Sequence, residues 1–243
     1  MDPTLTVLLY SSLAAGTAAL GAFPFVFRER LPITQIGWAN ALAAGMMLGA
    51  SYSLLVTGLD RQVVRGAVGA ALGILFVYWT HAASKTEDLD LNRLDESEPV
   101  YGYQVLLVNT LHSAAEGIAI GVAMIVSIPF GVFVAGAIAV HNIPEATILC
   151  AILTGRGVRV RDAGGLAVAA NVSQVLLAVV TFTVISAAPS MLPWALGFAV
   201  GALIYLVMSE LLPESYQQAG STTIALVTLA AMGVVALLQG VGG

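Results

Sequence analysis

Residues 101–154 decide the fold, and they read YGYQVLLVNTLHSAAEGIAIGVAMIVSIPFGVFVAGAIAVHNIPEATILCAILT. Tyrosines and one cysteine apart, the only ionisable side chains in this stretch are His112, Glu116, His141 and Glu145. A helix needs about 20 mostly apolar residues to cross the hydrocarbon core of a membrane, and the stretch is long enough for two. It therefore predicts two adjacent membrane spans, each with one histidine and one glutamate four residues apart.

The rest of the chain has the same character. Of its 243 residues 58% are apolar and only 9% are charged, whereas a soluble domain carries roughly 25% charged residues. Eight segments have the length and composition of a span. Their approximate bounds are Leu5–Phe27, Ile33–Leu59, Val64–Ala83, Tyr101–Ile128, Phe130–Thr154, Gly164–Ala187, Leu192–Leu212 and Thr222–Leu238. We predict an all-α polytopic membrane protein, with one transmembrane domain over residues 1–243.

The charged residues predict the orientation. An even number of spans places both termini on one side, and termini outside would leave seven of the nine Lys and Arg residues in inner loops. Those seven are Arg28, Arg30, Lys85, Arg93, Arg156, Arg159 and Arg161. Because inner loops are enriched in Lys and Arg, we expect both termini to lie outside. Residues 84–100 then form an acidic cytosolic loop, either simply solvated or a collector of released cations.

The two His–Glu pairs predict a metal site. Residues four apart share one face of a helix, and each histidine lies 11 residues into its span. At about 1.5 Å per residue that is roughly 16 Å deep, near the middle of a core about 30 Å thick. Imidazole and carboxylate together suit a divalent transition metal such as zinc, whereas magnesium and calcium prefer all-oxygen shells. A purely helix-stabilising polar contact would explain one pair, but nothing structural requires two.

Further polar residues lie near these pairs. Pro144 leaves the Val140 carbonyl without its usual helical partner, which a membrane tolerates where the carbonyl lines a cavity or meets an ion. Asn142 adjoins His141, and Ser113 occupies the matching position in the other span. Polar groups in the sixth predicted span, Asn171 and Gln174 among them, are equally explained by hydrogen bonds between helices.

At this point the motifs become recognisable. The sequence His141-Asn142-Ile143-Pro144-Glu145 resembles the HNxPE motif of the ZIP (Zrt-/Irt-like) family of metal transporters. Residues 112–117, HSAAEG, resemble the partner motif of the preceding span. Residues 197–215 and 44–48 resemble the seventh and second spans of the family. The resemblance covers most of the chain and favours a prokaryotic-type member in the plasma (inner) membrane.

The resemblance implies a function and a ligand set. A ZIP protein would move Zn²⁺, or Cd²⁺, Fe²⁺ or Mn²⁺, into the cytosol by alternating access, with the metal as substrate and no prosthetic group. His112, Glu116, His141 and Glu145 would form the main site, and Met47 would be a softer ligand. A second metal position would fall on Ser113, Asn142, Glu145 and either Asn171 or Gln174. Because the chain has a serine and amides where many members have stronger ligands, we expect one principal site.

Two other functions remain open at this stage. An intramembrane zinc-dependent hydrolase would use the metal to activate water, although the chain has no HExxH pattern and we do not expect an enzyme. A proton-coupled carrier of a small organic solute would use the histidines and glutamates as a relay. The expected partners are a divalent metal ion and the lipid bilayer, but no nucleic acid. The glycine-rich faces are also compatible with a homodimer.

Overall fold

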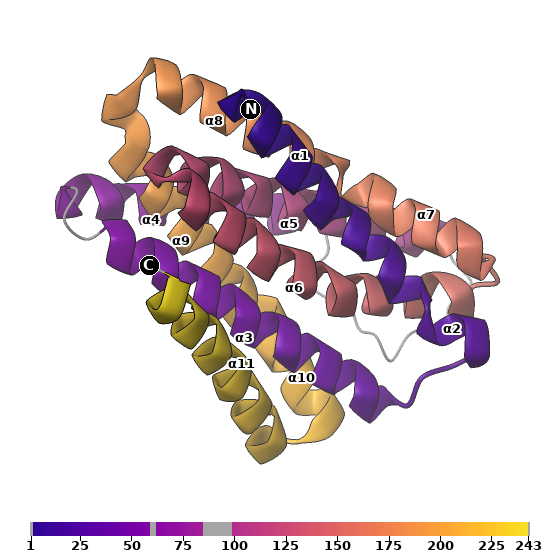
Figure 1. Ribbon diagram of the computed structural model, residues 1–243. Coiled ribbons are helices and arrows are strands. Elements are labelled where there is room, and N and C mark those ends of the chain that lie inside the picture. Colours follow the sequence, from indigo (N-terminus) through magenta and orange to yellow (C-terminus); the bar gives the residue numbers. More distant parts are fainter. Residues whose placement is uncertain (1, 59–61, 85–98, 243) are drawn as a thin grey trace.

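The computed structural model describes residues 2–58, 62–84 and 99–242, and the regular structure of these residues is helical (Figure 1). Eight helical passes are long and apolar enough to cross a membrane, which confirms the predicted all-α architecture of eight spans. Most of the predicted acidic loop lies outside the described residues.

The passes are built from the following elements. Span one comprises α1 (Pro3–Gly16), the short 3-10 helix η1 (Thr17–Ala22) and α2 (Pro24–Phe27), and spans two to five are α3 (Ile33–Gly58), α4 (Val63–Ser84), α5 (Pro99–Val126) and α6 (Ile128–Gly155). Span six comprises α7 (Val160–Ala170) and α8 (Val172–Ala187). Span seven comprises η3 (Pro189–Met191), α9 (Leu192–Leu206), η4 (Val207–Leu211) and α10 (Leu212–Ala219). Span eight is α11 (Ser221–Gly242).

Three spans that the sequence predicted as continuous are interrupted. Span one tightens into η1, span six breaks at Asn171, and span seven contains the π-helix η4 and then continues to Ala219, beyond the predicted end at Leu212. Irregular backbone inside a membrane is tolerated where it is buried in protein, so these interruptions indicate positions where the helices face each other. π-Helical turns are frequent at functional sites.

The spans form two groups. In the first, α5 and α6 pack against each other, α8 packs against α5 and α1, and η1 packs against α6. In the second, α4 packs along α9, and α3 packs along α11 and α10. The groups meet where α3 contacts α6 and where α5 contacts α9, and Figure 1 shows α6 lying between α1 and α3.

Glycines set the close crossings in the second group. A Cβ atom on Gly69 would collide with the Trp194 carbonyl, and one on Gly197 with the Gly66 carbonyl. A Cβ on Gly45 would likewise collide with the backbone of α11. Small residues allow helix backbones to approach this closely.

Candidate metal centre

Three of the four predicted ligands converge between α5 and α6. His141 Nε2 lies 2.8 Å from Oε1 of Glu116 and 3.3 Å from Oε2 of Glu145. One potential ligand atom from each of the three side chains lies within 4.8 Å of the others. The cluster therefore brings two carboxylates and one imidazole from two helices close enough to share a metal ion.

Burying the side chains of this cluster costs free energy unless a cation compensates their charge. The side chain of Glu116 is fully buried, His141 is 2% exposed and Glu145 is 11% exposed. Within the described part of the chain, neither oxygen of Glu116 nor Oε2 of Glu145 accepts a well-aligned hydrogen bond, despite the short contacts to His141. Buried carboxylates need compensation by hydrogen bonds, an opposite charge or a metal. Carboxylate oxygens without hydrogen bonds are better suited to binding a cation than to a hydrogen-bond network.

His112 lies beside the cluster rather than within it. Its Nδ1 is 3.7 Å from Oε1 of Glu145, and its Nε2 is 3.1 Å from Oε2 of Glu210. The cluster of three does not include His112, although the sequence predicted that all four side chains would meet. Glu145 nevertheless contacts both histidines, so the four predicted ligands form one connected group.

Glu210 is a member of this group that sequence reasoning missed. It lies on the π-helix η4 and reaches His112 from span seven. The sequence placed the end of span seven at Leu212, where a carboxylate needs no partner beyond water. Because the helix continues to Ala219, Glu210 lies well inside the span. The ESYQQ stretch after Pro213 hid this continuation, since hydropathy falls there while the helix does not end.

Asn109 is the second residue that was missed. It is buried on α5, and its side-chain amide donates a hydrogen bond of 2.6 Å to Oε1 of Glu145. This contact holds one oxygen of Glu145 and leaves the other directed at His141. The spacing could have revealed it, because Asn109 precedes Glu116 by seven residues and so shares its helix face.

Met47 lies near the cluster. Met46 and Met47 of α3 line a narrow internal cavity together with Glu116 and His141. Pro144 is buried inside α6, between His141 and Glu145 in the sequence. A thioether from the second group of spans thus borders the carboxylate and imidazole supplied by the first.

The residues predicted for a second metal position bind one another. The Asn142 amide donates to Oε1 of Gln174 at 3.0 Å and to the Ala14 carbonyl at 2.9 Å. The Ser113 hydroxyl contacts Oδ1 of Asn171 at 3.0 Å. Asn171 stands where span six breaks, so this network joins span one, span four, span five and the broken span six.

An eight-span membrane bundle with a buried histidine–carboxylate cluster defines a protein that handles cations inside the bilayer. Comparison with known proteins makes this class specific. Residues 78–241 match the family model described as ZIP zinc transporter. The chain therefore belongs to the ZIP family, and the resemblance drawn from its motifs is confirmed.

Two relatives support the same assignment. The chain is 30% identical over 224 residues to the protein named Zinc transporter GufA of Myxococcus xanthus, an alignment that covers 86% of this chain and 88% of that one. It is 34% identical over 227 residues to the protein named Putative zinc transporter At3g08650 of Arabidopsis thaliana, and this alignment covers 90% of the chain but only 36% of the plant protein. The predicted class, a membrane transporter of divalent metal ions, is the class of this family. The hydrolase and organic-solute alternatives are not favoured.

Proposed function

We propose that this chain carries divalent transition-metal ions, zinc foremost, through a site formed by Glu116, His141 and Glu145. The convergence of their ligand atoms within 4.8 Å in the buried interior is the observation that supports this most directly. Two carboxylates balance the charge of a dication that has shed its water, and the imidazole favours zinc over magnesium or calcium.

His112 and Met47 would complete the ligand set. Zinc is usually four-coordinate, and His112 already contacts Glu145 at 3.7 Å. Met47 borders the cavity beside Glu116 and His141, where a soft thioether can serve as a further ligand. Glu210 would then hold His112 in place, or receive the ion as it leaves the cluster.

We propose one principal site rather than two. The Ser113 hydroxyl, the amide nitrogens of Asn142 and Asn171 and the side-chain oxygens of Asn171 and Gln174 make hydrogen bonds within this set or to backbone carbonyls. Asn142 Oδ1 and Gln174 Nε2 are buried without such a partner among the described residues. These amides carry no charge to balance a second dication. They connect the helices that supply the ligands, and their hydrogen bonds support a connecting role rather than a second metal shell.

Transport would follow alternating access. The ion exchanges its water for the buried ligands and is released on the other side when the site opens there. Because histidine and carboxylate must lose their protons to bind a metal, protons compete with the ion. Uptake should therefore weaken as the pH on the entry side falls.

The orientation is also a proposal. Within the described residues, Arg28, Arg30, Arg156, Arg159 and Arg161 lie near one end of the eight passes and Arg65 lies near the other. This asymmetry supports both termini outside and the arginine-rich end in the cytosol. We place the protein in a prokaryotic plasma (inner) membrane, with uptake directed inward. The described glycines Gly45, Gly49, Gly69, Gly73, Gly197 and Gly201 pack within the chain, so a homodimer needs another surface.

The test is metal uptake into proteoliposomes that contain a fluorescent chelator, with Zn²⁺, Cd²⁺, Fe²⁺ and Mn²⁺ supplied in turn. His141→Ala and Glu145→Ala should reduce zinc uptake by more than about 100-fold, since loss of an outer-shell partner alone costs roughly 10–100-fold in metal affinity. Gly136→Ala on the same helix is the matched control, because a Cβ added there meets no atom within 4 Å. Unchanged uptake by Glu145→Ala would refute the ligand assignment.

A further inference from the structure

A groove unrelated to the metal centre runs between span one and span six. One wall of the groove is formed by η1 and α2, and the other wall by α7. The groove is open to its surroundings, and its space of about 680 Å³ is within the range of roughly 300–1,000 Å³ typical of ligand pockets. Its lining is apolar, with Phe23, Phe25 and Val26 on one wall and Val168 on the other, and Arg161 is the charged residue that lines it.

Two consecutive glycines shape this groove. Gly164 is buried against span one, where an added Cβ would lie 3.1 Å from the Cβ of Ala22. Gly165 is exposed and lines the groove, and an added Cβ there would meet no atom within 4 Å. The first glycine lets α7 approach span one, and the second leaves the space between them open.

An arginine lines one wall of the groove, and another adjoins the element that forms the opposite wall. Arg161 is exposed in the first turn of α7, and Arg28 follows directly after α2 on the opposite wall. Among the described residues, the acidic residues adjacent to these arginines in the sequence are Glu29 and Asp162, and Asp162 approaches Arg159 at 3.8 Å. Arginines at the end of a membrane span lie at the depth of lipid headgroups.

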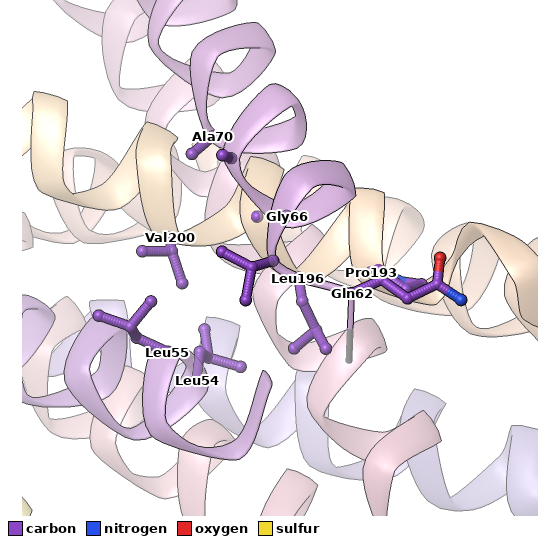
Figure 2. A pocket seen from close by; sticks show the side chains of 11 residues that line it. Leu54, Leu55, Gln62, Gly66, Ala70, Pro193, Leu196 and Val200 are labelled. Atoms are coloured by element: carbon purple, nitrogen blue, oxygen red, sulfur yellow. The ribbon is translucent and has the colours of Figure 1, made fainter. Parts of the chain in front are cut away.

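A second cavity offers a contrast. It lies between α3, α4 and α9 near the opposite end of the bundle, and it encloses about 180 Å³ (Figure 2). Figure 2 shows Leu54, Leu55 and Val200 gathered together and the Gln62 side chain at their edge. Of the residues that the structure describes, none of those that line it is charged. The groove at α7 is thus larger and combines an apolar lining with a cation.

We propose that the groove binds an anionic phospholipid, with an acyl chain against the apolar walls and the headgroup phosphate on Arg161. Both walls are linked by hydrogen bonds to the helices that carry the metal centre. Thr17 of η1 donates a hydrogen bond of 2.6 Å to the Ala139 carbonyl, two residues before His141. The other wall, α7, ends at Asn171, which accepts a hydrogen bond from Ser113. A bound lipid would therefore stabilise the packing of span one against span six.

The test is native mass spectrometry of the purified protein in detergent, titrated with phosphatidylglycerol or phosphatidylcholine of identical acyl chains. Wild type should bind phosphatidylglycerol more tightly than phosphatidylcholine. Arg161→Ala should weaken phosphatidylglycerol binding about fivefold, the effect of one arginine near an anionic surface. Gly165→Phe, which fills the groove, should weaken binding of both lipids, whereas Gly165→Ala should retain it.

Arg65→Ala is the matched control, because Arg65 is an exposed arginine at the opposite end of the bundle. Equal binding of the two lipids by wild type would overturn the proposal, as would equal losses in Arg161→Ala and Arg65→Ala. Unaltered binding by Gly165→Phe would also overturn it, because the acyl chain could not then occupy this groove. Since the measurement uses no metal, its failure would leave the proposed transport function untouched.

Discussion

The two groups of spans differ in how much buried polar side chains contribute to their packing. Spans one, four, five and six are joined by buried polar side chains, among them Asn142 with Gln174 and Ser113 with Asn171. Spans two, three, seven and eight are joined by glycine, with α4 against α9 and α3 against α11 at backbone contact. Lipid tails are as apolar as leucine, so helices in a membrane need hydrogen bonds or close packing to associate. Both groups use close glycine packing, since an added Cβ on Gly117 would collide with the backbone of Gln174. The first group adds the network of buried amides and hydroxyls, whereas the second has cross-span hydrogen bonds such as that from Thr228 to the Ala41 carbonyl.

The difference explains where a cation can bind. The polar group supplies Glu116, His141 and Glu145, whose unsatisfied oxygens face the interior. The glycine group presents Met47 and Glu210 to the same region from the other side. The centre therefore lies at the contact between a group rich in ligands and a group that is largely a tightly packed wall.

The largest effect is expected from breaking the glycine packing. Gly197→Leu forces a side chain into the Gly66 carbonyl, and because the obstacle is backbone, α4 and α9 must separate. Overpacking of this kind costs about 1–3 kcal/mol or more. Thermal unfolding in detergent should show a clear loss of stability, while Gly233→Leu, with no atom within 4 Å of an added Cβ, should show little. Equal stability of the two variants would contradict the close crossing.

A smaller effect is expected on the polar side from Asn109→Ala. Asn109 acts through Glu145, so its loss should weaken zinc affinity by roughly 10–100-fold without unfolding the protein. Isothermal titration of zinc in detergent measures this. Ser173→Ala removes a hydrogen bond of 2.7 Å to the Thr110 carbonyl but touches none of the ligands, and it should leave zinc affinity unchanged. A loss of the same size in both variants would mean that general loosening, rather than the orientation of Glu145, is responsible.

The smallest effect is expected from the amide pair. Asn142→Ala, Gln174→Ala and the double variant form a cycle that isolates their hydrogen bond. Hydrogen bonds between membrane helices average about 0.6 kcal/mol and reach about 1.7 kcal/mol, so the coupling in unfolding free energy should fall in that range. Zinc affinity measured on the same variants should change much less than in His141→Ala. A comparable loss of affinity would instead make Asn142 a ligand of the metal.

Much of this molecule could be predicted because a membrane helix is recognised from the apolar residues of its own segment. A long run of apolar residues in a bilayer forms a helix, because a helix satisfies its own backbone hydrogen bonds. Hydropathy alone therefore predicted the eight passes. Interruptions inside a span are harder to predict from the sequence. Asn171 breaks span six and Val207–Leu211 forms a π-helix, yet both lie in helix-favouring sequence. Backbone irregularity there depends on partners from other helices, which no local pattern contains.

The sequence by itself determined the eight spans, the family and the four ionisable groups of the fourth and fifth spans, because each rests on composition or short spacing. Only the tertiary structure decided how those groups meet: Glu116 approaches His141, while His112 turns to Glu145 and Glu210. It also placed Asn109 on Glu145 and joined Asn142 to Gln174. The physical reason is that spacing along one helix fixes which face a side chain occupies. The rotation and depth of the neighbouring helix decide which atom it meets.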